Sequence, residues 1–309
     1  MLEKYFLRLP TPQDERSVFD LMIRCDMREV GFPDSGIEDL RHDWEQINLA
    51  RDAWLAIDTK GALRGYCAAL PWDHGVRMVI YDDPGTENTD LFLGLLVMCE
   101  KRAANIIFDL NDPKKRRVCT HISDTSAHQK SVLEEAGYQI KKYIFNMHKE
   151  LSGEQPEPEL PQGFSIRTTI TGKDEPAIHA LVQDAFDWYE HDRMSFDEWQ
   201  AFIIHPDTYN PALWLLVEKD EEIIAACLGF QYPEMGWIRQ LAVKKEFRKL
   251  GLGRALLQRS FQAFKALGLP KVGLAVASDN PDAMHFYQTA GMTKAVQLDE
   301  YMKEINPGF

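Results

Sequence analysis

The chain has 309 residues, a length typical of two domains, and its 45% hydrophobic and 27% charged residues are typical of a folded protein. The formal net charge of −13 disfavours a nucleic-acid or anionic-membrane binder, because phosphate groups would repel it. Five scattered cysteines form no CxxC pair, which disfavours a zinc site and favours a reducing compartment. The N-terminus lacks the apolar core of a secretory signal, and no apolar run is long enough to cross a membrane. We therefore expect a cytoplasmic protein with no metal site.

Hydrophobic alternation and helical spacing predict the same order of elements twice, namely strand, two helices, hairpin, strand, helix, strand, helix and final strands. In the first half the predicted ranges are 5–9, 12–26, 37–49, 53–70, 76–81, 89–106, 117–122 and 126–136. In the second half they are 164–169, 173–188, 195–204, 213–218 with 223–230, 237–243, 252–267, 271–276 and 281–290. This order predicts an α+β fold, used twice, in which a mixed, mostly antiparallel sheet is flanked by helices.

A segment rich in Pro and Glu separates the halves. Residues 152–163 read SGEQPEPELPQG, and proline disfavours a helix in the residue before it, so the segment is extended and solvated. A structureless stretch of this length is uncommon inside a domain, which favours a boundary over the alternative of one long surface loop. We expect a domain at 1–151, a linker at 152–163 and a second domain at 164–309.

Matching short segments indicate that the halves are repeats. The tryptophans of Trp54-Leu-Ala-Ile and Trp214-Leu-Leu-Val lie 160 residues apart, and each is followed after thirteen residues by a cysteine. The Ser-Asp pairs at 123 and 278 are offset by 155, and the Ala-Gly pairs at 136 and 290 by 154. A nearly constant offset predicts duplication of one domain.

Residues 237–257, WIRQLAVKKEFRKLGLGRALL, predict a strand, a basic turn and a helix. Gly251 and Gly253 allow unusual backbone conformations and let main-chain amides approach a ligand. The unpaired N–H groups and positive dipole end of the following helix favour an anion such as a pyrophosphate. Residues 244–254 also carry a local charge of +4. The alternative is a glycine turn with solvated lysines.

Two other phosphate motifs do not fit this turn. A P-loop requires Lys and then Ser or Thr after its glycine, whereas Arg254 and Ala255 follow Gly253. A dinucleotide fingerprint requires a small residue three positions after its second glycine, and Leu256 stands there.

The RKLGLGRA turn at 248–255 resembles the acyl-CoA pyrophosphate loop of the GNAT superfamily of N-acetyltransferases. Downstream, NPDAMHFYQTAGM at 280–292 resembles that family's pattern of Asn, then Ala, then an apolar-Tyr pair and Gly. The resemblance is strong over 164–309, and over 3–151 it rests on the repeat and the element order. The whole chain resembles bacterial tandem-GNAT proteins, the architecture also seen in mycothiol synthase.

The resemblance implies a role for each matching residue. The strand end and the turn would hold the pantetheine arm and the pyrophosphate, and Tyr287 would be the general acid that protonates the departing CoA thiolate. The implied acyl-CoA residues are Leu241, Ala242, Val243, Arg248, Lys249, Leu250, Gly251, Leu252, Gly253, Arg254, Ala255, Asn280, Ala283 and Phe286. Read without the resemblance, Tyr287 is also compatible with a packed aromatic residue and Asn280 with a helix cap.

The general base is not clear from the sequence. The resemblance implies a glutamate on the fourth strand of the domain, but residues 237–240 contain no carboxylate, so Glu234 in the preceding turn is the candidate base. Residues 151–200 hold three basic and eleven acidic residues, which suits a cationic or polyhydroxyl amine, or else marks a solvated acidic face. The candidate residues of the acceptor site are Asp187, Trp188, Glu190 and Asp192. Other candidates for the base are Asp187, Glu190, His191, Asp192 and a water chain.

The first half lacks the residues that matter in the second. Its counterpart to the phosphate turn, YDDPGTE at 81–87, has one glycine, no basic residue and three carboxylates, which would repel a pyrophosphate. Leu133 takes the place of Tyr287. We expect that the first domain does not catalyse.

The resemblance implies an N-acetyltransferase that transfers an acetyl group from acetyl-CoA to a primary amine of a small soluble acceptor by direct attack. One alternative is a non-catalytic protein that senses acyl-CoA or an amine. Another is a peptide N-terminal acetyltransferase, which needs a groove open to an extended chain. The expected protein is a monomer or homodimer that binds neither nucleic acid nor membrane.

Overall fold

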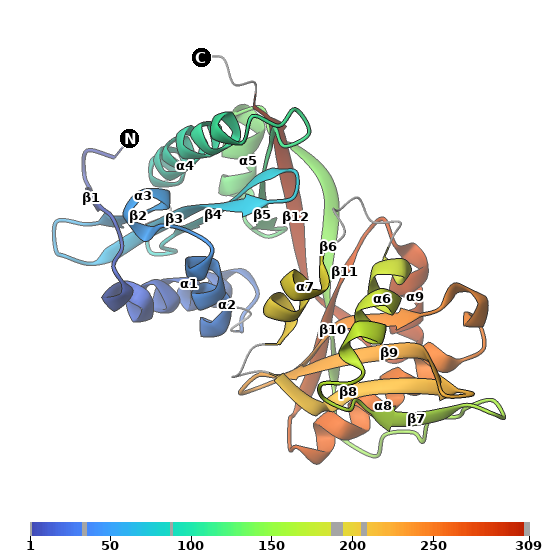
Figure 1. Cartoon of the computed structure of the whole chain (residues 1–309). Coiled ribbons are helices and arrows are strands. Elements are labelled where there is room, and N and C mark those ends of the chain that lie inside the picture. The colour runs from blue at the N-terminus through green and yellow to red at the C-terminus, as the bar shows by residue number, and fades with distance from the viewer. Residues whose placement is uncertain (1, 33–35, 87–88, 187–193, 205–208, 306–309) are drawn as a thin grey trace. The chain divides into compact units, whose positions relative to one another are not determined.

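The computed structural model describes residues 2–32, 36–86, 89–186, 194–204 and 209–305, and the chain divides into two compact units (Figure 1). Unit 1 comprises residues 1–144 and 296–309, and unit 2 comprises residues 145–295. The elements as far as β6 are β1 (Phe6–Arg8), α1 (Glu15–Glu29), α2 (Ile37–Glu45), α3 (Leu49–Asp52), β2 (Ala53–Ile57), β3 (Leu63–Trp72), β4 (Gly75–Asp82), α4 (Thr89–Leu110), β5 (Arg117–Ser123), α5 (Ala127–Glu135) and β6 (Gln139–Glu150). Those that follow are β7 (Ser165–Thr168), α6 (Glu175–Ala185), α7 (Phe196–Ile203), β8 (Tyr209–Lys219), β9 (Glu222–Gln231), β10 (Gly236–Val243), α8 (Leu252–Ala266), β11 (Lys271–Ala277), α9 (Pro281–Thr289) and β12 (Thr293–Glu304).

Unit 1 is a sheet with helices on both faces. Its strand order is β1-β2-β3-β4-β5-β12, with the β4–β5 pair parallel and the other four pairs antiparallel. Hydrophobic side chains of α4 and α5 pack against one face, and those of α1 and α2 pack against the other (Figure 1). These apolar stripes are what the helical spacing in the sequence predicts.

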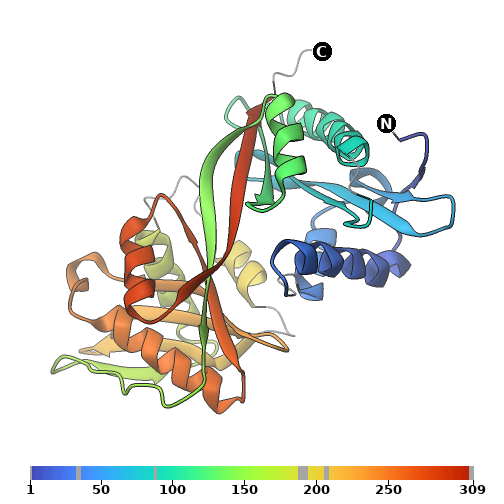
Figure 2. The same cartoon turned by 180° about the vertical axis from the view of Figure 1, so that it is seen from behind.

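Unit 2 repeats this plan with the strand order β6-β11-β10-β9-β8-β7. The β10–β11 pair is parallel, while β7, β8, β9 and β10 pair antiparallel in turn. Helices α8 and α9 cover one face, as the view from behind shows (Figure 2), and α6 and α7 cover the other. The predicted α+β class, with a mixed and mostly antiparallel sheet in each half, is confirmed.

The division of the chain differs from the predicted one at both ends of unit 2. Strands β6 and β12 each contribute residues to both units, and residues 298–304 of β12 pair with β5 in unit 1. The Pro- and Glu-rich segment lies within unit 2, where Gln262 Nε2 and Lys265 Nζ on α8 donate to its backbone carbonyls. Composition shows where a chain is extended and solvated, but it does not show which unit a strand joins.

The first strand of each unit is held to the following helix by the same ion pair. In unit 1, Arg8 Nη1 donates to Asp14 Oδ2 at 2.8 Å, and in unit 2, Arg167 Nη1 donates to Asp174 Oδ2 at 2.5 Å. Both carboxylates also accept a backbone N–H from the connecting loop. The repeat therefore includes side-chain contacts as well as element order.

One predicted helix is in fact two. The helix expected at 37–49 ends at Glu45, and a short helix begins after Asn48, whose side chain accepts the Ala50 N–H at 3.0 Å as an N-cap. Across the described residues, none of the helices has the length and apolar character needed to cross a bilayer. Within the same residues, no group of three or more His, Cys, Asp and Glu side chains could hold a metal ion.

Candidate active site

The site forms where β10 separates from its parallel neighbour. β10 pairs with β9 from Gly236 to Val243, but its pairing with β11 covers only Gly236 and Trp237. A register shift between Ile238 and Gln240 marks a β-bulge, which bends a strand and increases its twist. Beyond Trp237 the ladder with β11 ends, so the edge at residues 238–243 can pair with an extended ligand as an added strand would.

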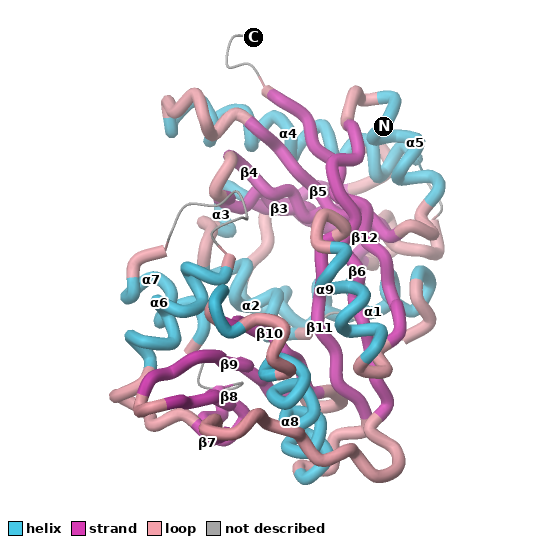
Figure 3. Tube along the Cα trace, turned by 90° about the vertical axis from the view of Figure 1, so that its right-hand side faces the viewer, coloured by secondary structure: helices cyan, strands magenta, loops and turns pink. Residues whose placement is uncertain are grey.

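A loop joins β10 to α8 (Figure 3). Two of its residues have a positive φ angle. Gly251, the N-cap of α8, has a φ of 85°, and Lys249 has a φ of 66°, which is uncommon for a residue with a side chain. Backbone strain of this kind clusters at ligand sites. The first N–H groups of the fifteen-residue helix α8 have no partner within the helix, so this end attracts anions.

Basic side chains line the same end of the site. Arg248 Nε donates to the Val243 carbonyl at 3.1 Å and ties the loop to the end of β10. Arg254 Nη2 donates to the Thr289 carbonyl at 2.6 Å and links the first turn of α8 to the last turn of α9. Together with Lys249 they make this end cationic, and Arg254 in addition positions α9.

Helix α9 carries the predicted general acid. Asn280 is its N-cap and accepts the Ala283 N–H at 3.2 Å, so the helix-cap interpretation of Asn280 is correct. Tyr287 lies two turns further on and packs against the core beneath α8. Burial, and to a lesser degree the neighbouring Cys227 thiol, raise the pKa of Tyr287, so its phenol is protonated at neutral pH.

One cavity of about 780 Å³ in unit 2 contains most of the predicted site. Its lining includes Leu241, Ala242, Val243, Arg248, Lys249, Gly251, Leu252, Gly253, Arg254, Asn280, Ala283, Phe286 and Tyr287. Leu250 and Ala255 are not part of it: Leu250 is exposed, and Ala255 is buried in the first turn of α8.

The cavity also has walls that the sequence motifs did not indicate, made by Ala185, Phe186, Phe247, Asp279, Pro281 and Asp282. Asp279, Pro281 and Asp282 flank Asn280, so their proximity could have been inferred from that motif. Ala185 and Phe186 stand at the end of α6, and they reach the cavity only because α6 packs on β10. Nothing in the local sequence indicates that contact.

The candidate base is not at the cavity. Glu234 is exposed in the turn before β10, at the opposite end of the strand from Leu241. Seven residues of extended chain separate the two, or about 23 Å along the strand. The candidate acceptor residues Asp187, Trp188, Glu190 and Asp192, and the candidate base His191, lie outside the described residues.

In unit 1, the turn at the end of β4 is the counterpart of the phosphate turn, and its second aspartate, Asp83, binds two arginines. Asp83 Oδ2 accepts Arg24 Nη2 and Arg64 Nη1, each at 3.1 Å, and Oδ1 accepts the Gly85 N–H at 2.9 Å. Burial of Asp83 works in the opposite direction, but the Gly85 amide and the two guanidinium groups lower the pKa of its carboxyl.

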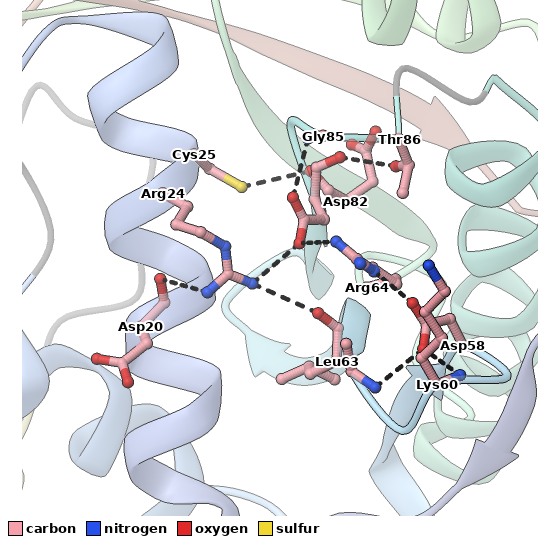
Figure 4. Close-up of polar contacts among 12 residues, drawn as sticks. Asp20, Arg24, Cys25, Asp58, Lys60, Leu63, Arg64, Asp82, Gly85 and Thr86 are labelled. Atoms are coloured by element: carbon pink, nitrogen blue, oxygen red, sulfur yellow. Dashed lines mark hydrogen bonds and ion pairs between the residues drawn. The ribbon is translucent and has the colours of Figure 1, made fainter.

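The first aspartate of this turn binds to α5. Asp82 is fully buried; its Oδ1 accepts Gln129 Nε2 at 2.5 Å, and His128 Nε2 lies 3.0 Å from its Oδ2. Its backbone carbonyl accepts the Cys25 thiol of α1 at 3.4 Å (Figure 4). Leu133, at the place of Tyr287, is fully buried in the core of unit 1. The turn is therefore filled by contacts within the unit itself.

Comparison with known proteins gives a family match over part of unit 2. Residues 176–292 match the model described as the acetyltransferase (GNAT) family. The mycothiol acetyltransferase of Saccharopolyspora erythraea is 28% identical over 185 residues, which is 58% of this chain and 59% of that protein. The chain thus spans a little over half the length of the curated relatives that it matches.

Two solved structures resemble the chain over nearly its whole length. A GCN5-related N-acetyltransferase from Sphaerobacter thermophilus has a TM-score of 0.86 at 26% identity and covers 99% of this chain and 98% of that one. A tandem GNAT protein from the clavulanic acid biosynthesis pathway has a TM-score of 0.77 at 13% identity, over 99% and 100% of the two chains, and this likeness shows the fold alone. Both matches extend over the two units.

Proposed function

We propose that the chain is an acetyltransferase of the GNAT type that transfers an acetyl group from acetyl-CoA to a primary amine of a small acceptor. The match of residues 176–292 to the acetyltransferase (GNAT) family and the likeness of the chain to two solved GNAT structures support this proposal. One observation carries the proposal: the open edge of β10, the turn at Gly251 and Gly253, and Tyr287 line the same cavity. The five cysteines form no disulfide, which supports a reducing compartment such as the cytoplasm.

The residues of the cavity fit an acyl-CoA. Its volume of about 780 Å³ lies within the usual range of ligand pockets. The N-terminus of α8 with Arg248 and Lys249 would bind the pyrophosphate, and the backbone of 238–243 would pair with the pantetheine amides. When bound, acetyl-CoA supplies an activated thioester carbonyl that an amine can attack directly.

In the proposed reaction, Tyr287 holds the proton that the departing thiolate needs. Its raised pKa keeps the phenol protonated, and a thiol pKa of about 8.5 means that a Tyr hydroxyl stabilises the developing thiolate mainly through a hydrogen bond. Backbone N–H groups at the open end of β10 would stabilise the oxyanion of the tetrahedral intermediate.

The acceptor amine must also lose a proton, because an amine of pKa about 10 arrives as ammonium. Among the described lining residues the carboxylates are Asp279 and Asp282, which lie at the start of α9, and Glu234 is remote. We therefore propose that the base comes from Asp187, Glu190, His191 or Asp192, or from water. In the sequence these residues directly follow Phe186, which lines the cavity.

A thiol-release assay with acetyl-CoA and a panel of aminoglycosides, polyamines and amino acids tests this function. The expected result is CoA release that depends on one class of amine, with the acetylated product confirmed by mass spectrometry. Tight CoA binding without release for every amine would contradict the proposal and would favour a non-catalytic sensor.

A further inference from the structure

The cavity of unit 2 has two chemically different ends. Arg248, Lys249 and Arg254 line one end beside the start of α8. At the other end, where α6 meets β10, the lining is apolar and consists of Ala185, Phe186, Leu241 and Ala242. The open edge of β10 runs between the ends, so a ligand with its phosphates on the loop would direct its acyl group toward the apolar end.

Phe186 is fixed at that end by its backbone and by its ring. It is the C-cap of α6, and its N–H donates to the Val182 carbonyl at 3.1 Å. Its half-buried side chain packs against the hydrophobic cluster on the α6 and α7 face, to which Ala242 also belongs. Phe186 therefore lines the cavity together with Leu241 and Ala242, the strand residues beside which the thioester would lie.

The hydrophobic cluster that Phe186 packs against is tightly filled by aromatic side chains. Trp199, Trp214 and Phe230 belong to the same cluster and are at most 1% exposed. Trp214 is in ring contact with the other two, each at 6.0 Å between centroids. A core of this packing density accepts an extra methylene group only when side chains move.

We propose that Phe186 sets the acyl-chain length, so that the enzyme accepts acetyl-CoA and propionyl-CoA and rejects butyryl-CoA and longer donors. This inference rests on the proposed function, because it assigns the acyl group to the apolar end of the same cavity. Leu241 and Ala242 line the same cavity as Phe186, and the small side chain of Ala242 takes up little of the space.

The test measures kcat/KM for acetyl-, propionyl-, butyryl- and hexanoyl-CoA with one amine, in the wild type, Phe186→Ala and Phe186→Leu. Phe186→Ala is expected to raise the ratio of butyryl to acetyl turnover by about 10- to 100-fold, the usual discrimination from one or two methylene groups, and Phe186→Leu by less. Phe247→Ala is the matched control, because Phe247 lines the cationic end and its loss should lower kcat/KM equally for all donors.

Two results would overturn the inference: an unchanged butyryl to acetyl ratio in both Phe186 variants, or an effect confined to the KM of the amine. Failure of the proposed function looks different, because no donor would then be turned over with any amine. In that case the dissociation constants of acetyl-CoA and butyryl-CoA, measured by calorimetry for the same three proteins, test the chain-length inference independently.

Discussion

In unit 2, β10 leaves β11 after Trp237, and the space beside it is a cavity with a cationic turn. In unit 1, β4 leaves β5 after Arg77, and the turn that follows is filled by two aspartates bound to the unit's own side chains. The strands also differ, because β10 contains a bulge while the register of β4 with β3 is uninterrupted. At the same separation of parallel strands, unit 2 therefore has a cavity, whereas in unit 1 the unit's own side chains fill the turn.

The two units also differ in how the charges of the turn are balanced, and in unit 1 the acidic turn is stabilised by side chains of the same unit. The two aspartates of the turn have partners of their own: Arg24 and Arg64 for Asp83, and Gln129 and His128 for Asp82. A buried carboxylate is tolerated only when it is paired and hydrogen-bonded. We therefore expect substitutions in the two turns to affect different properties, ligand binding in unit 2 and stability in unit 1.

The largest effect is expected from Gly253→Asp, which should abolish CoA binding measured by calorimetry. A Cβ at Gly253 would stand 3.6 Å from Phe286 and Val243, an ordinary contact, so the fold is preserved. The carboxylate would project into the phosphate end of the cavity, and a negative charge near a helix N-terminus favours the helix itself. Gly253→Ala, which adds a methyl group without charge, should lose far less affinity. If Gly253→Asp binds CoA as well as the wild type does, the phosphate site must lie elsewhere in unit 2 or in unit 1.

Tyr287→Phe should lower kcat by about 10²- to 10⁴-fold while the affinity for CoA stays within about twofold, because the ring remains and only the proton donor is lost. The control is Tyr301→Phe in unit 1, which removes a hydroxyl that donates to Glu134 Oε1 at 3.0 Å and should leave kcat unchanged. Leu133 holds the corresponding place in unit 1 and cannot donate a proton. A wild-type turnover rate in Tyr287→Phe would therefore contradict the assignment of Tyr287 as the acid and of unit 2 as the catalytic unit.

Asp82→Ala should destabilise unit 1 by about 2–3 kcal/mol, because Gln129 loses its buried acceptor. Hydrogen exchange in peptides covering β4 and α5 would report the loss, which Asp82→Asn should reduce, since its amide oxygen still accepts Gln129. The CoA affinity of unit 2 should not change. A second CoA site appearing in Asp82→Ala would overturn the comparison, because it would mean that the aspartate merely blocks a working site.

The sequence was sufficient where residue type dictates backbone geometry. Gly251 takes the positive φ angle that a glycine allows. The local motifs also indicated the 248–255 turn and Tyr287, the proposed phosphate site and the proposed acid, which line one cavity. Glu234 lies away from the cavity, because residues that are a few positions apart along an extended strand are far apart in space. Phe186 was missed because its position depends on how α6 packs on β10.

The contacts of unit 1 were beyond local analysis for a similar reason. The sequence presented Asp82 and Asp83 only as charges that would repel a pyrophosphate. Their partners Arg24, Arg64 and His128 stand between 19 and 59 positions away, on three separate elements. The sequence also did not indicate that β6 and β12 each contribute residues to both units. The alternation of side chains along a strand is the same whichever strand it pairs with, so it does not identify the partner.

The smallest expected effect is the contribution of Asp83 to the pH dependence of the free energy of unfolding. Its pKa is lowered in the folded chain, so its charged form contributes stability above the unfolded pKa of about 3.9, and this contribution is lost as the pH falls through the folded pKa. The difference in unfolding free energy between wild type and Asp83→Asn should therefore be constant from neutral pH to about pH 5 and shrink below pH 4. Arg24→Met combined with Arg64→Met should remove most of the same pH dependence, since these cations hold the pKa down. A difference that stays constant to pH 3 would show that Asp83 stabilises the turn through its size and amide contact alone, and the charge contrast between the two turns would then not account for the stability of unit 1.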